Sequence, residues 1–222
     1  MAAIAQTIGQ LNDIECTQIM NLLIPLDKNI FKKVDFVKQQ YGLNFKESLE
    51  YVVTNNPILW AKVYLDWETR DYQHVIIQEG KNSKKLVLRL GRRLGKSDSM
   101  CVLILWFAYT QYNRGPNNQY DIIIATPYET QIDLIFKRLH QLIDMSPVLK
   151  SLITRDVHHN LNLTINGIVS NILGLTAGAN NSSGGANSTR GQRADLLILD
   201  EADKLEKSRL FAIYNIVRLK SR

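Results

Sequence analysis

Apolar residues in the first part of the chain recur at the three-to-four-residue spacing of helices. This spacing predicts short helices over residues 8–24 and 30–40, which Pro25 and Asp27 divide. The same spacing follows Asn44, a residue type that caps helix starts, so another helix is expected there. This part of the chain therefore reads as helical, and it contains no cluster of catalytic residue types.

After Pro57, which opens a further apolar segment, the pattern changes to an alternation of strands and helices. Residues 98–112 are apolar on most of a helical circumference, the run from Asp121 is typical of a buried parallel strand, and residues 128–145 again have helical spacing. Such alternation is typical of an α/β domain.

Apolar and polar residues alternate in the two segments on either side of Asn166 and Gly167. This residue pair strongly predicts a β-hairpin. We expect an α/β domain over residues 61–222 that includes this hairpin as an insertion. Residues 1–60 are expected to form an N-terminal helical region, with a lid, a partner-docking surface or packing as its open roles.

A strand-like run, a basic glycine turn and a helix-like segment follow one another in KLVLRLGRRLGKSDSM. Leu86 to Leu90 form the expected strand. Turn amides and the positive end of the next helix surround phosphate oxygens in such an arrangement, Lys96 reaches the β and γ phosphates, and the Ser97 hydroxyl ligates Mg²⁺. The candidate phosphate-binding residues are Gly91, Arg92, Arg93, Leu94, Gly95, Lys96, Ser97 and Asp98.

The acidic end of a second apolar run supports this interpretation. Residues 194–199 read as a buried strand that Asp200 and Glu201 follow directly. Buried carboxylates need a partner, and in P-loop ATPases the first acid serves the Mg²⁺ shell while the second polarises the attacking water. We therefore expect Asp200 to serve the metal and Glu201 to act as general base.

Tyr72 and Gln73 lie about two dozen residues before Lys96. An aromatic ring can stack on adenine and a glutamine amide can hydrogen-bond it, because the amide offers both a donor and an acceptor. The alternative for this pair is a helix-capping or core role.

The formal charge of +6 is concentrated around the phosphate loop, and a second basic cluster lies near the end of the chain. This balance suits a polyanion such as ATP or DNA, whereas a solvated basic face is the alternative for the second cluster.

No apolar run is long enough to span a bilayer, and no secretory signal is visible. Cys16 and Cys101 are expected to be reduced. His158 and His159 are expected to point to opposite faces of a strand, which argues against metal binding by this pair.

The sequences LGRRLGKS and LLILDEAD together resemble the ATPase domain of the large terminase subunit, the motor that packages DNA into tailed-phage capsids. In this family the first glycine of the loop is often displaced and followed by an arginine, as in Gly91-Arg92. The resemblance covers most of residues 67–203 and includes Tyr72-Gln73 as an adenine-contacting motif.

The resemblance implies a P-loop NTPase of the ASCE type, with a mostly parallel central sheet flanked by helices. It implies that Arg190 acts on the ATP of a neighbouring subunit, with Arg193 as the fallback, and that Arg92 or Arg93 senses the γ phosphate in its own subunit. The implied cofactors are ATP and Mg²⁺.

The implied function is ATP-driven translocation of double-stranded DNA into a procapsid. The implied partners are DNA, the portal and the small terminase subunit, without a membrane. The implied assembly is a ring homo-oligomer, with a monomer as the alternative for the isolated chain. The implied place is the cytoplasm of the infected bacterial host and, transiently, the procapsid portal. The family's coupling motif and nuclease domain would follow Arg222, so no nuclease activity is expected from this chain.

Two alternatives remain open at this point. The literal Asp-Glu-Ala-Asp at 200–203 suggests a superfamily-2 helicase or another DNA translocase, against which the basic phosphate loop counts. The other alternative is a non-catalytic packaging scaffold in which nucleotide is only a structural ligand.

Overall fold

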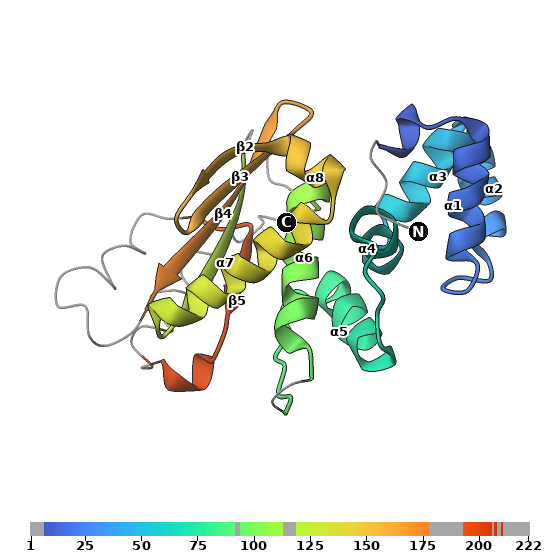
Figure 1. Ribbon diagram of the computed structural model, residues 1–222. Coiled ribbons are helices and arrows are strands. Elements are labelled where there is room, and N and C mark those ends of the chain that lie inside the picture. Colours follow the sequence, from blue (N-terminus) through green and yellow to red (C-terminus); the bar gives the residue numbers. More distant parts are fainter. Residues whose placement is uncertain are drawn as a thin grey trace. The chain divides into compact units, whose positions relative to one another are not determined.

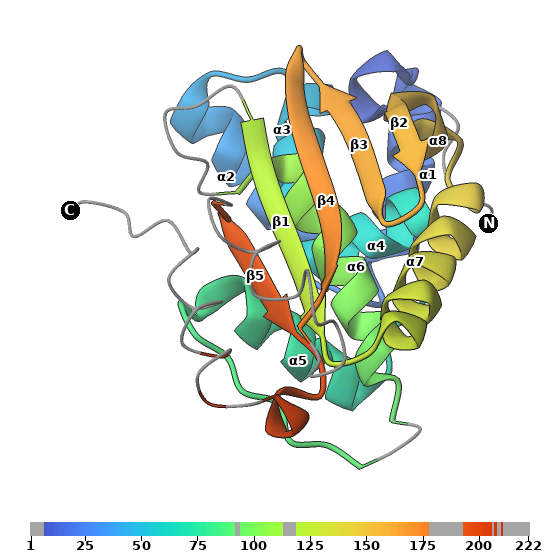
Figure 2. The same ribbon diagram turned by 90° about the vertical axis from the view of Figure 1, so that its left-hand side faces the viewer.

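The computed structural model describes residues 7–91, 94–112, 119–177 and 193–205, together with residues 207 and 210. The chain divides into two compact units. The first comprises residues 1–106 and 141–151, and the second comprises residues 107–140 and 152–222. The described part of the first unit is helical, whereas the second carries the β-sheet (Figures 1 and 2).

Short helices joined by tight turns build the first unit (Figure 1). Their bounds are η1 (a 3₁₀ turn, Ile8–Gln10), α1 (Asp13–Leu23), α2 (Ile30–Tyr41), α3 (Phe45–Thr54), α4 (Pro57–Leu65), α5 (Asp71–Asn82) and the start of α6 (Lys96–Thr110). The predicted helices on either side of Pro25 and after Asn44 are confirmed, and the apolar segment that Pro57 opens is helix α4. The predicted strand over Leu86–Leu90 is not formed.

Asparagine side chains cap the starts of α1, α3 and α4, as the sequence predicts for Asn44. The Asn44 side chain accepts a hydrogen bond from the Glu47 amide at 3.0 Å, and the Glu47 carboxylate accepts one from the Asn44 amide at 2.9 Å. This reciprocal pair satisfies two backbone donors that the helix itself leaves unpaired.

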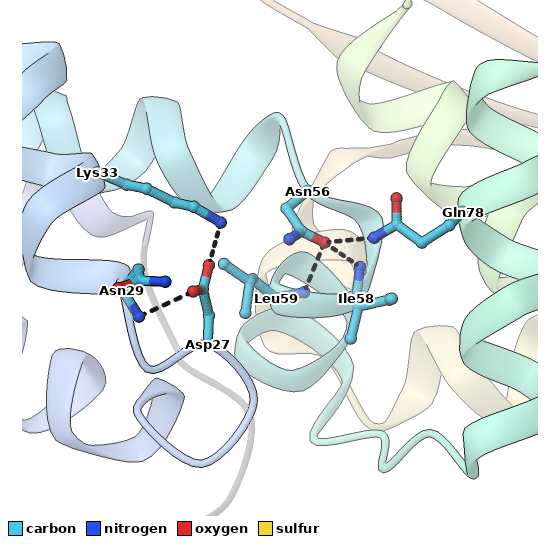
Figure 3. A network of polar contacts seen from close by, with 7 residues as sticks. All are labelled: Asp27, Asn29, Lys33, Asn56, Ile58, Leu59 and Gln78. Carbon is cyan, nitrogen blue, oxygen red and sulfur yellow. Dashed lines mark hydrogen bonds and ion pairs between the residues drawn. The ribbon is translucent and has the colours of Figure 1, made fainter.

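Asn56 caps α4 and also reaches a second helix (Figure 3). Its Oδ1 atom accepts hydrogen bonds from the Ile58 amide at 3.0 Å, from the Leu59 amide at 3.5 Å and from Gln78 Nε2 of α5 at 3.5 Å. Because one oxygen serves both helices, Asn56 ties the start of α4 to α5.

Helix α4 forms the centre of the first unit. All nine of its residues are buried, and the Trp60 and Tyr64 rings stack with their centroids 5.7 Å apart. Lys62 is buried as well, and its ammonium lies 2.9 Å from Asp66 and 3.0 Å from Glu68, which offsets the cost of burying its charge.

A five-stranded sheet in the order β2-β3-β4-β1-β5 organises the second unit (Figure 2). The strands are β1 (Gln119–Thr126), β2 (Ile153–Val157), β3 (Asn160–Ile165), β4 (Ile168–Thr176) and β5 (Leu196–Leu199). Strand β1 pairs in parallel with β4 and β5, whereas β2, β3 and β4 pair antiparallel, so the sheet is mixed. The remaining elements along this part of the chain are α7 (Glu129–Asp144), α8 (Pro147–Leu152) and η2 (a 3₁₀ turn, Ala202–Lys204).

Strand β1 is buried on both faces from Tyr120 to Thr126, which explains its continuous apolar run. On one face Ile123 and Ala125 belong to a core cluster with Leu205. On the other face α7 packs closely on β4, because a β-carbon on Gly174 would lie 2.5 Å from a methyl carbon of Ile132. Glycine at this position therefore allows the helix to approach the sheet.

The predicted hairpin is confirmed between β3 and β4. Asn166 and Gly167 both have positive φ, at 51° and 78°, as a two-residue hairpin turn requires. The second strand of the hairpin also pairs with β1, so the hairpin is part of the central sheet and not an insertion outside it.

Among the residues that the structure describes, no helix is both long enough and apolar enough to cross a membrane.

Replacing Asn56 tests its double role as a cap and as a link to α5. We expect Asn56→Ala to lower the free energy of unfolding by about 1–2 kcal/mol, because two helix-start amides and the Gln78 amide lose their acceptor. Asn56→Asp keeps the acceptor oxygen and is expected to retain most of the stability. Urea unfolding of the three proteins measures this, and equal losses in both variants would contradict the assigned role.

Candidate functional site

The predicted phosphate loop, in the first unit, ends in a glycine that has a left-handed backbone. Gly95 has φ of +64°, and α6 begins directly after it at Lys96. The Gly95 carbonyl accepts hydrogen bonds from the amide and from the hydroxyl of Ser99, both at 3.1 Å. Helix α6 therefore starts directly at this turn, and a helix start that follows a glycine turn is a common place for anions to bind in proteins.

The residues around this turn differ in exposure. Lys96 and Asp98 are half-buried, whereas Ser97, Gly91 and Leu94 are exposed. Arg92 and Arg93 lie outside the described residues. The described part of the loop therefore offers a lysine, a hydroxyl and a helix start to a ligand.

Tyr72 and Gln73 lie beside the same glycine, although more than twenty residues separate them in sequence. Gln73 is 5% exposed, and its Nε2 atom donates to the Gly95 carbonyl at 3.4 Å. Its Oε1 atom accepts from the Arg70 amide at 3.1 Å, so Gln73 also caps the start of α5. A β-carbon on Gly95 would lie 3.6 Å from the Tyr72 hydroxyl. The capping role and the place beside the loop are both observed.

The expected strand over Leu86–Leu90 is not formed, which corrects the sequence prediction. These residues have neither helical nor strand structure, and Val87 is 90% exposed. A strand exists only when another strand accepts and donates its backbone hydrogen bonds, and no described strand pairs with this run. Its apolar sequence alone therefore did not determine its structure.

The acidic pair of the second unit follows β5, as predicted. The Asp200 amide donates to the Ala125 carbonyl of β1 at 3.2 Å, and the Glu201 amide donates to the Asp200 carboxylate at 3.1 Å. Glu201 has φ of +50°, so the backbone turns sharply between the two acids and η2. Both acids are half-buried at the carboxyl end of β5.

The Glu201 carboxylate is ion-paired with Lys204, one turn further along the chain. The hydrogen bond to Glu201 raises the pKa of Lys204. At the end of the neighbouring strand, the Thr126 hydroxyl donates to the Tyr128 carbonyl at 2.7 Å. A lysine, a threonine and two carboxylates therefore lie at the ends of two adjacent parallel strands, the sheet edge at which ligands bind in α/β proteins.

Most of the predicted arginine positions lie outside the residues that the structure describes. Arg190 lies outside the described residues, whereas Arg193 is described and exposed just before β5. The positions of Arg92, Arg93 and Arg190 therefore remain predictions from sequence.

A cavity of about 540 Å³ in the helical unit was not anticipated from sequence. Its lining includes Lys32, Lys33 and Lys81, and Lys33 pairs with Asp27. Burial lowers the pKa of Lys81, whose ammonium donates to the Asn55 carbonyl. The lysines come from α2 and α5, so only the packing of the helices brings them together.

The expectation for the adjacent histidines is wrong. His158 and His159 form the turn between β2 and β3, not part of a strand, and His158 has φ of +48°. Their ring centroids lie 3.8 Å apart, so both rings point to the same side.

Comparison with known proteins gives likeness in structure alone. No protein-family model matches the chain, and no curated protein matches its sequence. Among solved structures, a point mutant of the large terminase ATPase domain of Thermus phage P74-26 superposes with a TM-score of 0.54 at 19% identity, over 68% of this chain and 61% of that one.

Two longer terminases give similar values. The large terminase of bacteriophage HK97 has a TM-score of 0.56 at 14% identity, with 73% of this chain and 34% of that one covered. The large terminase of a thermophilic bacteriophage has a TM-score of 0.51 at 10% identity, with 67% and 36% covered. The match spans less than two thirds of each of these proteins. The resemblance seen in sequence is thus confirmed at the level of structure, and this chain has the fold of the ATPase domain of phage large terminases.

Proposed function

We propose that this chain is the ATPase motor domain of a viral large terminase, which couples ATP hydrolysis to translocation of double-stranded DNA into a procapsid. The observation that carries the proposal is the terminase ATPase fold in a chain that has Gly95-Lys96-Ser97 at a helix start and Asp200-Glu201 at a strand end. Likeness to terminases favours this function over a helicase or a non-catalytic scaffold.

The fold proposal is a P-loop NTPase of the ASCE type. The three parallel strands β4, β1 and β5 support it, because ligands bind at the carboxyl ends of parallel strands. We further propose an N-terminal helical region over residues 1–60 and an ATPase domain over 61–222, a boundary that falls within α4.

ATP fits the described loop residues. The left-handed turn at Gly95 and the start of α6 directly after it suit phosphate oxygens, and Lys96 neutralises the β and γ phosphates there. Tyr72 stacks on the adenine, and the Gln73 amide hydrogen-bonds it. Gln73 is already held by the Arg70 amide and the Gly95 carbonyl, so its amide is positioned before nucleotide binds.

The donor set of Ser97 and Asp200 fits Mg²⁺, because hydroxyl and carboxylate oxygens are the ligands this ion prefers. When bound, the ion neutralises charge that develops on the phosphates. Glu201 orients the water and accepts its proton. Before that step Glu201 must leave Lys204, with which it is paired in this structure.

The remaining roles rest on residues outside the described ranges and on the family resemblance. Arg190 stabilises the transition state from an adjacent subunit, and Arg92 or Arg93 senses the γ phosphate. The proposed partners are double-stranded DNA, the portal and the small terminase subunit. The proposed assembly is a ring in the cytoplasm of the infected bacterium, docked transiently at the procapsid portal.

Two substitutions separate nucleotide binding from hydrolysis. We expect Lys96→Ala to lose ATP binding, because the phosphates lose their counter-charge. Glu201→Gln should bind ATP normally and hydrolyse it about 10²–10⁴ times more slowly, because the proton acceptor is gone. Fluorescent-nucleotide binding and phosphate release with and without DNA measure the two effects. Lys84→Ala removes an exposed charge from the same basic stretch and serves as the control. Wild-type turnover by Glu201→Gln would refute the assignment.

The loop glycines offer a matched pair for stability. A β-carbon on Gly95 would lie 2.4 Å from Gln73 Nε2 in a backbone with positive φ, whereas on Gly91 its nearest neighbour is a Leu94 carbon at 3.5 Å. We expect Gly95→Ala to lower the free energy of unfolding by about 1–3 kcal/mol and Gly91→Ala to change it by less than about 0.5 kcal/mol. Urea unfolding tests this, and equal stabilities would contradict the observed packing of Gln73 on Gly95.

Mixing two inactive chains tests the role of Arg190. If Arg190 acts on the ATP of a neighbour, Arg190→Ala mixed with Lys96→Ala should recover part of the DNA-stimulated ATPase rate. Where the two variants meet, the Arg190→Ala chain supplies an intact phosphate loop and the Lys96→Ala chain supplies an intact arginine. Absence of recovery under conditions in which the wild-type chain assembles would leave Arg190 either acting in its own subunit or in a structural role.

A further inference from the structure

The turn between β2 and β3 brings two histidines to one side of the sheet. The positive φ of His158 is an uncommon conformation for a residue with a side chain, and it folds the His158 ring onto that of His159. The two rings meet edge to face, at an interplanar angle of 62°. Uncommon backbone conformations of this kind are concentrated at functional sites.

Helix α7 adds a carboxylate to this pair. Glu129 is its first residue, and one ligand atom from each of Glu129, His158 and His159 lies within 4.8 Å of the other two. One turn further along α7, Asp133 Oδ1 lies 2.7 Å from His159 Nε2. This contact fixes the orientation of the His159 ring and leaves Nδ1 as the nitrogen for a further ligand.

Strand β4 holds both parts of the cluster in place. The Gly174 amide donates to the His159 carbonyl at 2.8 Å, and Ile132 and Phe136 of α7 pack on the same glycine. The histidine turn and the start of α7 are therefore anchored to one residue of the sheet. The three donor groups are brought together before any ligand binds.

We propose that Glu129, His158 and His159 form a binding site for a divalent transition metal, and that Zn²⁺ is the ion the donor set fits. Two imidazoles and one carboxylate are ligands that zinc accepts in proteins, and imidazole nitrogens disfavour Mg²⁺ and Ca²⁺. Asp133 acts as a positioning residue, since a metal-bound histidine usually donates its second ring N–H to a carboxylate. Three protein ligands leave a fourth position open to water or another ligand.

This site is separate from the proposed Mg²⁺ ligands. The histidine turn precedes β3, whereas Asp200 follows β5, and β4 and β1 lie between these strands. Three interstrand spacings of about 4.8 Å place them roughly 14 Å apart across the sheet. The two sites also differ in donor chemistry, because Ser97 and Asp200 offer only oxygen.

Zinc binding to the metal-free full-length chain tests the proposal. Zn²⁺ is titrated in competition with a chromophoric chelator, in excess Mg²⁺ so that oxygen-donor sites are filled. We expect one tightly bound Zn²⁺ per chain. His158→Asn and Glu129→Gln should each weaken binding at least about tenfold, and Asp133→Asn by about 10- to 100-fold. Asparagine tolerates positive φ, so His158→Asn removes the ligand without forcing the turn to change.

His140→Ala is the matched control. His140 also lies on α7 and pairs with a carboxylate, that of Asp156 at 3.0 Å, but it is not part of the cluster. This variant should bind Zn²⁺ like the wild type, and circular dichroism should show all variants folded. A wild-type chain that binds no Zn²⁺ would overturn the proposal. So would unchanged binding in both His158→Asn and Glu129→Gln, or an equal loss in His140→Ala.

Thermal unfolding provides a second measurement. Zn²⁺ at about a hundredfold excess over its dissociation constant should raise the Tm of the wild type by roughly 5–10 °C. Mg²⁺ at the same concentration should not reproduce this shift, nor should Zn²⁺ added to His158→Asn. Equal shifts in the wild type and in His158→Asn would place the bound zinc elsewhere.

Discussion

The candidate nucleotide site depends on the hydrogen bonds that the Gly95 carbonyl accepts. Three donors meet on this one oxygen, namely the amide and hydroxyl of Ser99 and the side chain of Gln73. They can do so only because the backbone at Gly95 turns into the left-handed region, where a β-carbon would collide with Gln73. Because residue 95 has no side chain, the loop, the start of α6 and α5 can all contact one another at this carbonyl.

In the sheet-bearing unit the corresponding constraint is the burial of β1 on both faces. The middle of β1, from Ile122 to Ala125, is apolar, and its buried polar residues lie toward its ends. The parallel pairing of β1 with β4 and β5 brings the carboxyl ends of these strands to one edge. Strand β3 runs antiparallel to β4, so the histidine turn before β3 lies at the same edge as the acidic pair, although the two are far apart in sequence.

Features set by local hydrogen bonds were predictable from sequence, and features set by packing were not. The Asn44 cap is a hydrogen bond to a residue three positions away, and the Asn166-Gly167 turn depends on the φ angles of its own two residues. The residue types alone therefore indicate both features. The apolar run at Leu86–Leu90 was misread because a strand is defined by its partner. The histidine pair was misread because alternation on a strand was assumed where the chain turns. The proximity of Gln73 to Gly95 was supplied by the family resemblance and not by periodicity.

Helix α5 carries a further consequence of the Asn56 contact. Its first turn holds Gln73 against the predicted phosphate loop, and about 12 Å further along its axis Lys81 lines the cavity of the helical unit. Between them Gln78 is bound to Asn56 (Figure 3). A short helix moves as one rigid rod. An occupant of the cavity and the ATP of our proposal would therefore contact opposite ends of one short helix, which Asn56 also ties to the start of α4.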